Sequence, residues 1–436
     1  MVAANTVEHD SRLRRSAWAL AGDGHTVTIV GFAAPGLPAE ERLGERVLVR
    51  RIALDRRVSS AFRPIPVGVR FRLARLLGIE PAAVVLAPDS RPGVRRIPAL
   101  IRRVTEIVAN LRRTGPWREL VLASAPDTDV FHAKALVALP VIRGAARRRG
   151  ARFVYDVADF HTEAARLSRM PGPVRRLIRR AERRWVREAS GLTAVSEAVA
   201  AEVVRRYDVG PPAILLNAPF AWRPDEPGPP LDDGRLRTAA GLPSERSLLL
   251  YQGGLSVDRG IEELIAALDE PPLAGRDMAV VLLGFGRLRT ALVAEAARRP
   301  GRLVVLDPVP PEELVGYTVG ADVSYVGQPP RTLNQRLNLA NKLFESLMAG
   351  VPVVVAHGTE HCRFVSREAV GACADIDRPA AVAAALARLL DAPAGERARL
   401  RAHCRTLALE QFTWERQQTG IVELYRRLAA GREPAA

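Results

Sequence analysis

The chain has 436 residues, a length typical of two or three domains. Hydrophobic residues make up 48% and charged residues 26%, which argues against disordered and collagen-like chains. No apolar run reaches the roughly 18 residues of a membrane-spanning helix, and the N-terminal residues lack the apolar stretch of a signal peptide. We therefore expect a soluble, cytoplasmic protein.

The cysteines and histidines show no pattern typical of a metal site. Cys362, Cys373 and Cys404 have neither zinc-ligand spacing nor an evident disulfide framework, and the seven histidines are scattered. The sequence therefore predicts reduced cysteines, no metal and no resident cofactor.

The basic residues are almost all arginine. The formal net charge is +16, and only two of the 64 basic residues are lysines, Lys134 and Lys342. This skew is typical of coding bias in a GC-rich genome, which replaces lysine by arginine on solvated surfaces. Arginine does not replace lysine where a compact ammonium is needed. The two lysines are therefore candidate site residues, and chance survival is the alternative.

Short apolar runs alternate with helical patterns along the chain. In the first half, apolar spacing predicts a helix over 10–21. Predicted strands lie at 26–32, 46–54, 119–125, 129–133, 152–158, 192–196 and 213–219. The segment 55–118 is interrupted by arginine and proline and gives no clear pattern.

A Pro-rich and acidic stretch at 219–234 lacks periodicity and predicts an interdomain linker. Beyond it, strands are predicted at 247–255, 279–286, 302–308, 322–328 and 351–357. Helices are predicted at 259–268, 287–299, 311–321, 341–350, 379–392 and about 414–430. Repeated strand–helix units predict two doubly wound α/β domains with parallel sheets. Ligands of such folds bind at the carboxyl ends of strands, so we expect a site in a cleft between the domains.

The first candidate site segment begins at Asn341 and reads NKLFE. Lys342 and Glu345 lie three residues apart in the first turn of a predicted helix and share a face. A helix N-terminus presents N–H groups and partial positive charge, so a lysine there suits a diphosphate, and the carboxylate can accept hydrogen bonds from ribose hydroxyls. The alternative is an Asn-capped amphipathic helix with a Lys–Glu surface pair, and the local pattern leaves both open.

The second candidate segment leaves a predicted strand and enters a helix. Gly253 and Gly254 would let a ligand approach the backbone, and Arg259 can bind phosphate oxygens with two N–H groups. A Gly-Gly turn by itself is a weak signal, and an ordinary turn is the alternative.

Together, the patterns GGL-x3-RG-x-E and NKLFE-x3-AGVPVV resemble the donor-binding half of retaining, GT-B-fold glycosyltransferases of the large group-1 (family 4-like) family. The resemblance is strongest over 245–425 and implies a GT-B fold of two Rossmann-like domains. It implies that Arg259 and Lys342 hold the donor diphosphate and that Glu345 contacts the ribose. The loop at Pro308 and Val309 would frame the base. The donor-binding prediction comprises Gly253, Gly254, Arg259, Pro308, Val309, Asn334, Asn341, Lys342 and Glu345.

The resemblance also divides the chain. It implies an acceptor-side domain at 1–220, a nucleotide-sugar domain at 221–412 and a terminal helix at 413–436 that crosses back to the first domain. Only Val2–Ala4 precede the first loop, which leaves open a short first strand or a start further upstream.

The N-terminal half resembles the family with departures. The run DVFHAKAL resembles the family's "DvyHaHDl", with His132 kept and Lys134 in place of the second histidine. We expect His132 to contact the transferred sugar or a reacting hydroxyl, and both residues to act in catalysis; a satisfied histidine at a strand end is the alternative. The first loop resembles "N…D-x-R", which places Asp10 and Arg12 on the acceptor side.

Two further positions depart from the family pattern. YDVAD resembles "YDaHE" with Ala158 in the histidine's place, and His161, three residues later, is predicted to face the same cleft. Many members have two glutamates eight residues apart, but Leu337 stands eight residues before Glu345, so Asn334 is placed near the sugar instead.

These features predict a retaining, metal-independent glycosyltransferase whose donor is a nucleotide-diphosphate sugar, with UDP favoured over GDP. The departures leave open a catalytically altered or silent GT-B partner subunit. The net charge of +16 is typical of nucleic-acid-binding proteins. The sequence contains no zinc-finger pattern and no RNA-recognition aromatics, so we expect no nucleic-acid partner. The acceptor, a small secondary metabolite or a cell-surface or lipid-linked glycan, is left open.

Two arginine-dense segments at 143–152 and 174–187 suggest a membrane contact. The second has apolar residues at helical spacing opposite a basic face, which can bind anionic lipid. This would place the enzyme at the inner face of the membrane, and a solvated helix face is the favoured alternative.

Overall fold

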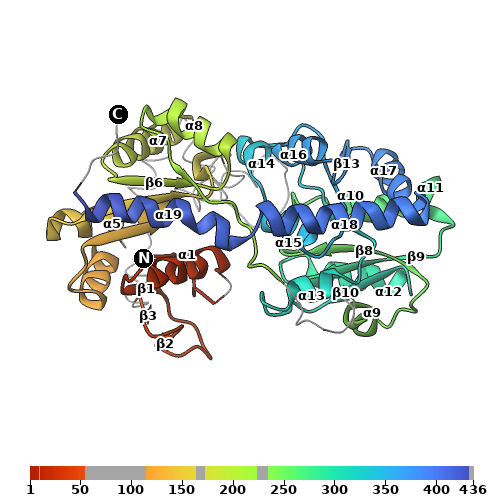
Figure 1. Cartoon of the computed structure of the whole chain (residues 1–436), viewed down its shortest axis with the longest axis horizontal. Coiled ribbons are helices and arrows are strands. Elements are labelled where there is room, and N and C mark those ends of the chain that lie inside the picture. The colour runs from red at the N-terminus through yellow and green to blue at the C-terminus, as the bar shows by residue number, and fades with distance from the viewer. Residues whose placement is uncertain (9, 55–113, 164–171, 223–233, 432–436) are drawn as a thin grey trace, which may run out of the picture. The chain divides into compact units, whose positions relative to one another are not determined.

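The computed structural model describes residues 1–8, 10–54, 114–163, 172–222 and 234–431 (Figure 1). The chain divides into two compact units, one of Met1–Leu192 with the C-terminal end from Ala430, and one of Thr193–Ala429. The division falls inside β6 (Gly191–Ala194). The predicted domain boundaries at 220 and 412 stay predictions.

The second unit is built on a six-stranded sheet in which every pair of neighbours is parallel. Its strands are β8 (Ser247–Gln252), β9 (Met278–Leu283), β10 (Leu303–Leu306), β11 (Val323–Val326), β12 (Val353–Ala356) and β13 (Gly371–Ala374). Their order is β10-β9-β8-β11-β12-β13, so the first strand lies in the middle and the winding reverses between β8 and β11. A ligand crevice forms at the carboxyl ends of the strands beside such a reversal.

Helices cover both faces of this sheet. The helices α10 (Ile261–Ala267), α11 (Pro271–Ala274), α12 (Arg289–Arg298) and α17 (Pro379–Asp391) pack into one core. The helices α13 (Leu314–Thr318), α15 (Asn341–Met348), α16 (Glu360–Glu368) and α18 (Ala394–Gln411) pack into the other, and α18 lies against α15 (Figure 1). Within β8, Leu248 and Leu250 enter one core while Leu249 and Tyr251 enter the other, the alternation of a strand buried on both faces.

The first unit begins with Val2, which pairs in parallel with both Val30 and Ala133. It continues through α1 (Ser11–Gly22), β1 (Val27–Phe32), β2 (Glu40–Arg42) and β3 (Val47–Ile52). The strand order is β1-β3-β2, with β2 antiparallel. Then β4 (Val130–Lys134), α5 (Ala135–Arg149) and β5 (Arg152–Val157) form a parallel strand–helix–strand unit, followed by η2 (His161–Glu163) and α7 (Gly172–Arg187).

The remaining elements belong to the second unit or span the division. They are α8 (Glu197–Tyr207), β7 (Ala213–Ile214), α9 (Arg235–Ala240), α14 (Leu333–Leu337) and α19 (Trp414–Ala429). The strand β6 pairs in parallel with β7, and α19 contacts β7. Within the described ranges, no helix is both long and apolar enough to cross a bilayer.

The structure corrects one predicted strand. Residues 119–125 were expected to form a strand, but residues 114–124 are helical. Trp117 and Val121 are buried and lie four residues apart, so the apolar run fits one face of a helix as well as a strand. Most of the segment 55–118 and of the predicted linker 219–234 lies outside the described residues.

The cysteine prediction was also wrong. Cys362 on α16 and Cys373 on β13 form a disulfide with their Cα atoms 5.5 Å apart, and Cys404 is free and buried. The two cysteines lie 11 residues apart in sequence, and the return of the chain from α16 into β13 brings them together. No cysteine motif in the sequence indicates this pairing.

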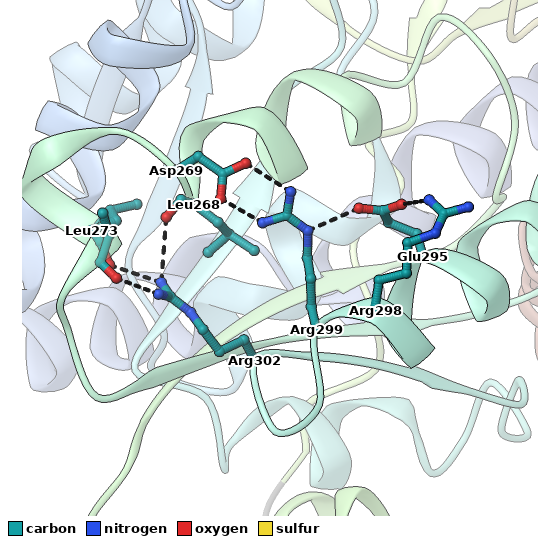
Figure 2. Close-up of polar contacts among 8 residues, drawn as sticks. Leu268, Asp269, Leu273, Glu295, Arg298, Arg299 and Arg302 are labelled. Atoms are coloured by element: carbon teal, nitrogen blue, oxygen red, sulfur yellow. Dashed lines mark hydrogen bonds and ion pairs between the residues drawn. The ribbon is translucent and has the colours of Figure 1, made fainter.

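Arginines hold several connections of the second unit together. Arg299 binds Asp269 through two hydrogen bonds of 2.5 and 2.7 Å and Glu295 through one of 2.8 Å (Figure 2). The hydrogen bonds that Arg299 donates to these carboxylates raise its pKa. Arg302 donates to the carbonyl oxygens of Leu268 and Leu273, which closes the end of α10 onto the start of β10 (Figure 2). In this region the arginines serve internal structure.

Candidate donor-binding site

The loop between β8 and α10 is built for close backbone approach. Gly253 has φ +114° and donates its N–H to the Leu283 carbonyl at 2.9 Å. Gly260 has φ +72°, and a β-carbon there would lie 1.9 Å from the Gly327 oxygen. Gly254, in contrast, has open space where a side chain would begin. The loop therefore needs glycine at 253 and 260 for its own conformation, and at 254 it leaves room beside the backbone.

The N-terminus of α15 lies beside this loop. Its N-cap residue is Ala340, so no side chain caps the first N–H groups. The ammonium of Lys342 lies 3.9 Å from the centroid of the Tyr251 ring, and a β-carbon on Gly253 would be 3.6 Å from it. Burial, followed by repulsion from Arg259, lowers the pKa of Lys342 to about 7. Lys342 thus lies at the glycine loop.

Neither predicted phosphate-binding cation has an ion-pair partner in the described part of the chain. Lys342 is in cation–π contact with Tyr251, and Arg259 makes no hydrogen bond or ion pair there. Arg259 is close enough to Lys342 for its charge to lower the pKa of the lysine. The two therefore concentrate positive charge beside the uncapped start of α15.

Glu345 is held by a chain of hydrogen bonds that the sequence did not reveal. Gln252 at the end of β8 donates to Glu345 at 3.0 Å, and Thr318 of α13 donates to Gln252 at 2.6 Å. Gln252 and Thr318 are buried, and Glu345 is partly exposed. These hydrogen bonds fix the Glu345 carboxylate one helical turn beyond Lys342, and part of that side chain remains exposed. A polar residue ending a buried strand was the available signal for Gln252.

The other predicted donor residues follow neighbouring strands. Pro308 is exposed and Val309 partly buried after β10, and Asn341 is the first residue of α15. Asn334 lies in α14, whose Gln335 donates to the Asp258 carbonyl at 3.4 Å next to Arg259. The carboxyl ends of β8, β10 and β11 thus present the predicted set, with Asn334 on the helix that contacts the glycine loop.

The acceptor-side predictions in the first unit form two ion pairs. Arg12 binds Asp156 through two hydrogen bonds of 2.8 Å, and both side chains are 5% exposed. Lys134 binds Asp10, which also caps α1 through the Leu13 N–H. The structure therefore brings Asp10, Arg12 and Lys134 into one polar region with Asp156, a residue that the prediction had left out.

His132 is buried in the same region. Burial lowers its pKa to about 4, against the opposing charge of Asp156, so the imidazole is neutral at neutral pH. Burial also lowers the pKa of His161 in η2, where Asp159 opposes the shift. No described contact joins His161 to His132, so the prediction that it faces the same site stays a prediction.

Two strained backbone positions flank the Lys134–Asp10 pair. Val7 has φ +69° and Ala135 has φ +70°, and neither is glycine. The Val7 N–H donates to Asn5 Oδ1 at 2.9 Å, and Asn5 donates to Asp10 at 2.8 Å. Such strain persists only where the surroundings enforce it, and it concentrates at functional sites.

The basic segments carry several ion pairs. On α7, Arg179 binds Glu163, while Arg184 and Arg143 of α5 both bind Glu188. Leu177 is 68% exposed on the same helix. The structure thus gives α7 a basic, partly paired face, and its contact with a membrane stays a prediction.

Known proteins place these features in a family. No protein-family model matches the chain. Over 394 residues it is 27% identical to a 2-deoxystreptamine glucosyltransferase of Streptomyces kanamyceticus, covering 88% of this chain and 89% of that protein. It is 29% identical to a D-inositol 3-phosphate glycosyltransferase of Xylanimonas cellulosilytica over 61% and 63% of the chains. A GDP-mannose-dependent phosphatidylinositol dimannoside mannosyltransferase of Mycobacterium tuberculosis is 31% identical over 40% and 42%.

Solved structures agree on the fold. Sucrose-phosphate synthase of Thermosynechococcus elongatus superimposes with a TM-score of 0.68 at 17% identity, over 96% of this chain and 93% of that chain. This chain is a group-1 glycosyltransferase of the GT-B fold. The Anabaena protein HepE in complex with UDP-glucose superimposes on the glycosyltransferase with a TM-score of 0.56 at 17% identity, over 71% of this chain and 81% of that chain. The predicted family and fold are confirmed.

Among the described residues of the glycosyltransferase, no group of three or more histidine, cysteine, aspartate or glutamate side chains is placed to hold a metal ion. The cations and helix N-terminus at the glycine loop are therefore the groups that the described site offers to an anionic ligand.

Proposed function

We propose that this glycosyltransferase binds a nucleotide-diphosphate sugar, UDP-linked in preference to GDP-linked, at the carboxyl ends of β8 and β11. The observation that carries this proposal is the pairing pattern of the cations. Lys342 and Arg259 form no ion pair within the described residues, although the Glu345 carboxylate attracts Lys342, whereas Arg12 and Lys134 are ion-paired. A desolvated ammonium is unfavourable unless a ligand supplies negative charge, and a diphosphate does so.

The ribose and the base of the donor would lie along the carboxyl ends of the strands, from β8 towards β10. Glu345, oriented by Gln252, would accept hydrogen bonds from the ribose hydroxyls. The loop with Pro308 and Val309 follows β10, which lies two strands from β8, or about 10 Å away. That separation suits a nucleoside extending from a diphosphate held at Gly253. The UDP-glucose complex of HepE supports UDP, and the mannosyltransferase named as GDP-mannose-dependent makes GDP the alternative.

We infer a retaining, metal-independent transfer. The bond from the anomeric carbon to the diphosphate breaks while the acceptor oxygen bonds to that carbon on the same face. The acceptor proton passes to a leaving phosphate oxygen. Lys342, Arg259 and the α15 N-terminus stabilise the departing negative charge without reorganisation. Neutral His132 would hydrogen-bond the transferred sugar or the reacting hydroxyl. The acceptor side would be lined by Lys134, Asp10, Arg12 and His161.

For the acceptor, we infer a cyclitol-like polyol. The named substrates of two relatives, 2-deoxystreptamine and D-inositol 3-phosphate, are both hydroxylated six-membered carbocycles. A lipid-linked acceptor would suit a membrane contact through 143–152 and 174–187, and a free cyclitol would need none.

The test is a transfer assay with UDP-glucose, UDP-N-acetylglucosamine and GDP-mannose against 2-deoxystreptamine and inositol 3-phosphate, with and without EDTA. Product linkage is read from the anomeric proton coupling by NMR. An α-linked product from an α-linked UDP-sugar in EDTA is expected. An inverted product or a metal requirement would contradict the mechanism, and nucleotide binding without transfer would favour the silent partner subunit.

A further inference from the structure

A buried histidine outside the proposed contacts holds the start of the lysine-bearing helix. His361 on α16 is 1% exposed, and its Nε2 accepts the N–H of Ala340 at 2.9 Å. Ala340 is the N-cap residue of α15 and has no side chain able to cap the helix. His361 therefore fixes the backbone at the point where α15 begins.

The geometry sets the protonation state of this ring. An acceptor at Nε2 requires that the imidazole proton lie on Nδ1. Burial, followed by the charge of Lys342, lowers the pKa of His361 to about 3. A neutral ring keeps its acceptor and adds no positive charge next to Lys342.

The element that carries His361 is itself restrained. Thr359 caps α16 by accepting the Cys362 N–H at 3.2 Å, and its hydroxyl donates to the Ala356 carbonyl at 2.6 Å at the end of β12. The disulfide from Cys362 to Cys373 ties the same turn to β13. His361 thus lies on a restrained turn, and its hydrogen bond to Ala340 restrains the start of α15 in turn.

We propose that His361 is a positioning residue for diphosphate recognition. Through Ala340 it sets the position and direction of the first-turn N–H groups of α15 and of the Lys342 ammonium, without touching the donor. This inference rests on the proposed donor site and deepens it. It predicts a selective effect: loss of the His361 acceptor should weaken contacts with the phosphates and leave those with the base unchanged.

The experiment compares His361→Leu, which removes the acceptor, with His361→Gln, whose amide oxygen can take the place of Nε2. Leu390→Ala serves as a control, because it truncates a buried α17 side chain in the opposite core and destabilises the unit elsewhere. For each variant, affinities for UDP (GDP, if the wild type prefers it) are measured by calorimetry. Affinities for the matching nucleoside are measured by NMR titration.

His361→Leu should bind the nucleotide about tenfold more weakly, with nucleoside affinity changed less than about twofold, and His361→Gln should restore the wild-type value. Unchanged nucleotide affinity in His361→Leu, or equal losses for nucleotide and nucleoside, would overturn the proposal. If His361→Leu does not fold, His361→Asn, whose amide is too short to reach Ala340, replaces it with the same expectations. Failure of the wild type to bind either nucleotide would instead contradict the proposed function.

Discussion

The Lys342 ammonium lies 3.9 Å from the centre of the Tyr251 ring, so it faces an aromatic ring where Arg12 and Lys134 each face a carboxylate. Tyr251 is the last residue but one of β8, and its hydroxyl donates to the Gly254 carbonyl at 2.8 Å. One side chain thus supports both the lysine and the glycine loop. A ring face stabilises a cation without neutralising it, which keeps the ammonium available to an anion.

This environment predicts pH-dependent donor binding. The pKa of Lys342 is about 7 in the free protein, and an unperturbed lysine has a pKa of about 10.4. Because a bound diphosphate favours the charged form, binding raises this pKa and takes up a proton. Above pH 7 the free lysine must first be protonated, so UDP affinity should fall by up to about tenfold per pH unit.

Calorimetry between pH 7 and 9 in buffers of different ionisation enthalpy measures both the affinity and the proton uptake. Lys342→Met is the control and should bind UDP weakly with no such pH dependence. A wild-type dissociation constant that stays flat over this range would show that Lys342 does not titrate on binding.

Two substitutions along the hydrogen-bond chain to Glu345 should weaken UDP binding to different extents. Gln252→Leu removes the hydrogen bond to Glu345 and the one that Gln252 accepts from Thr318. It should therefore lower the free energy of unfolding by about 1–3 kcal/mol and weaken UDP binding. Thr318→Val removes only the distal donor and should affect UDP binding less. Denaturant unfolding and calorimetry give the two quantities. Equal UDP affinity in wild type and Gln252→Leu would exclude a role for these hydrogen bonds in orienting the Glu345 carboxylate.

The buried pair in the first unit predicts a large stability effect. Arg12→Met takes the guanidinium away from the buried Asp156 carboxylate and should cost about 3–5 kcal/mol of stability. The double change Arg12→Met with Asp156→Leu should cost less than the single change. Arg205→Ala, which removes an exposed guanidinium paired with Glu202, should destabilise the protein far less. Urea unfolding decides between these values. A small effect of Arg12→Met would mean that water compensates the carboxylate.

A glycine of the donor loop and a glycine of α18 should respond differently to substitution by alanine. Gly260→Ala forces a β-carbon to 1.9 Å from the Gly327 oxygen at φ +72°, so it should destabilise the protein by more than about 2 kcal/mol. Gly395→Ala in α18 meets open space, and its effect should stay within about 1 kcal/mol. Thermal unfolding compares them. Similar melting temperatures for the two variants would contradict the loop geometry.

The sequence predicted the strand–helix alternation of the second unit well, because its strands are short apolar runs separated by clear helical patterns. It also placed Lys342 and Glu345 on one helix face, since that needs only local spacing. It did not reveal the bond between Gln252 and Glu345, whose residues lie 93 positions apart. Such pairs depend on strand order, which periodicity does not encode.

The helix at 114–124 was predicted as a strand for a different reason. Its apolar run is too short for its period to separate the two structures, and the burial of one helix face decides the outcome. The Cys362–Cys373 disulfide and the His361–Ala340 contact both follow from where α16 begins after β12, and no residue pattern indicates either.

The most direct test of the donor site is calorimetric titration of UDP and GDP, in EDTA, into the wild type and Lys342→Ala. We expect micromolar binding of UDP by the wild type and a loss of about 100-fold or more in the variant. Equal UDP affinity in the two proteins would contradict the assignment of Lys342 to the diphosphate.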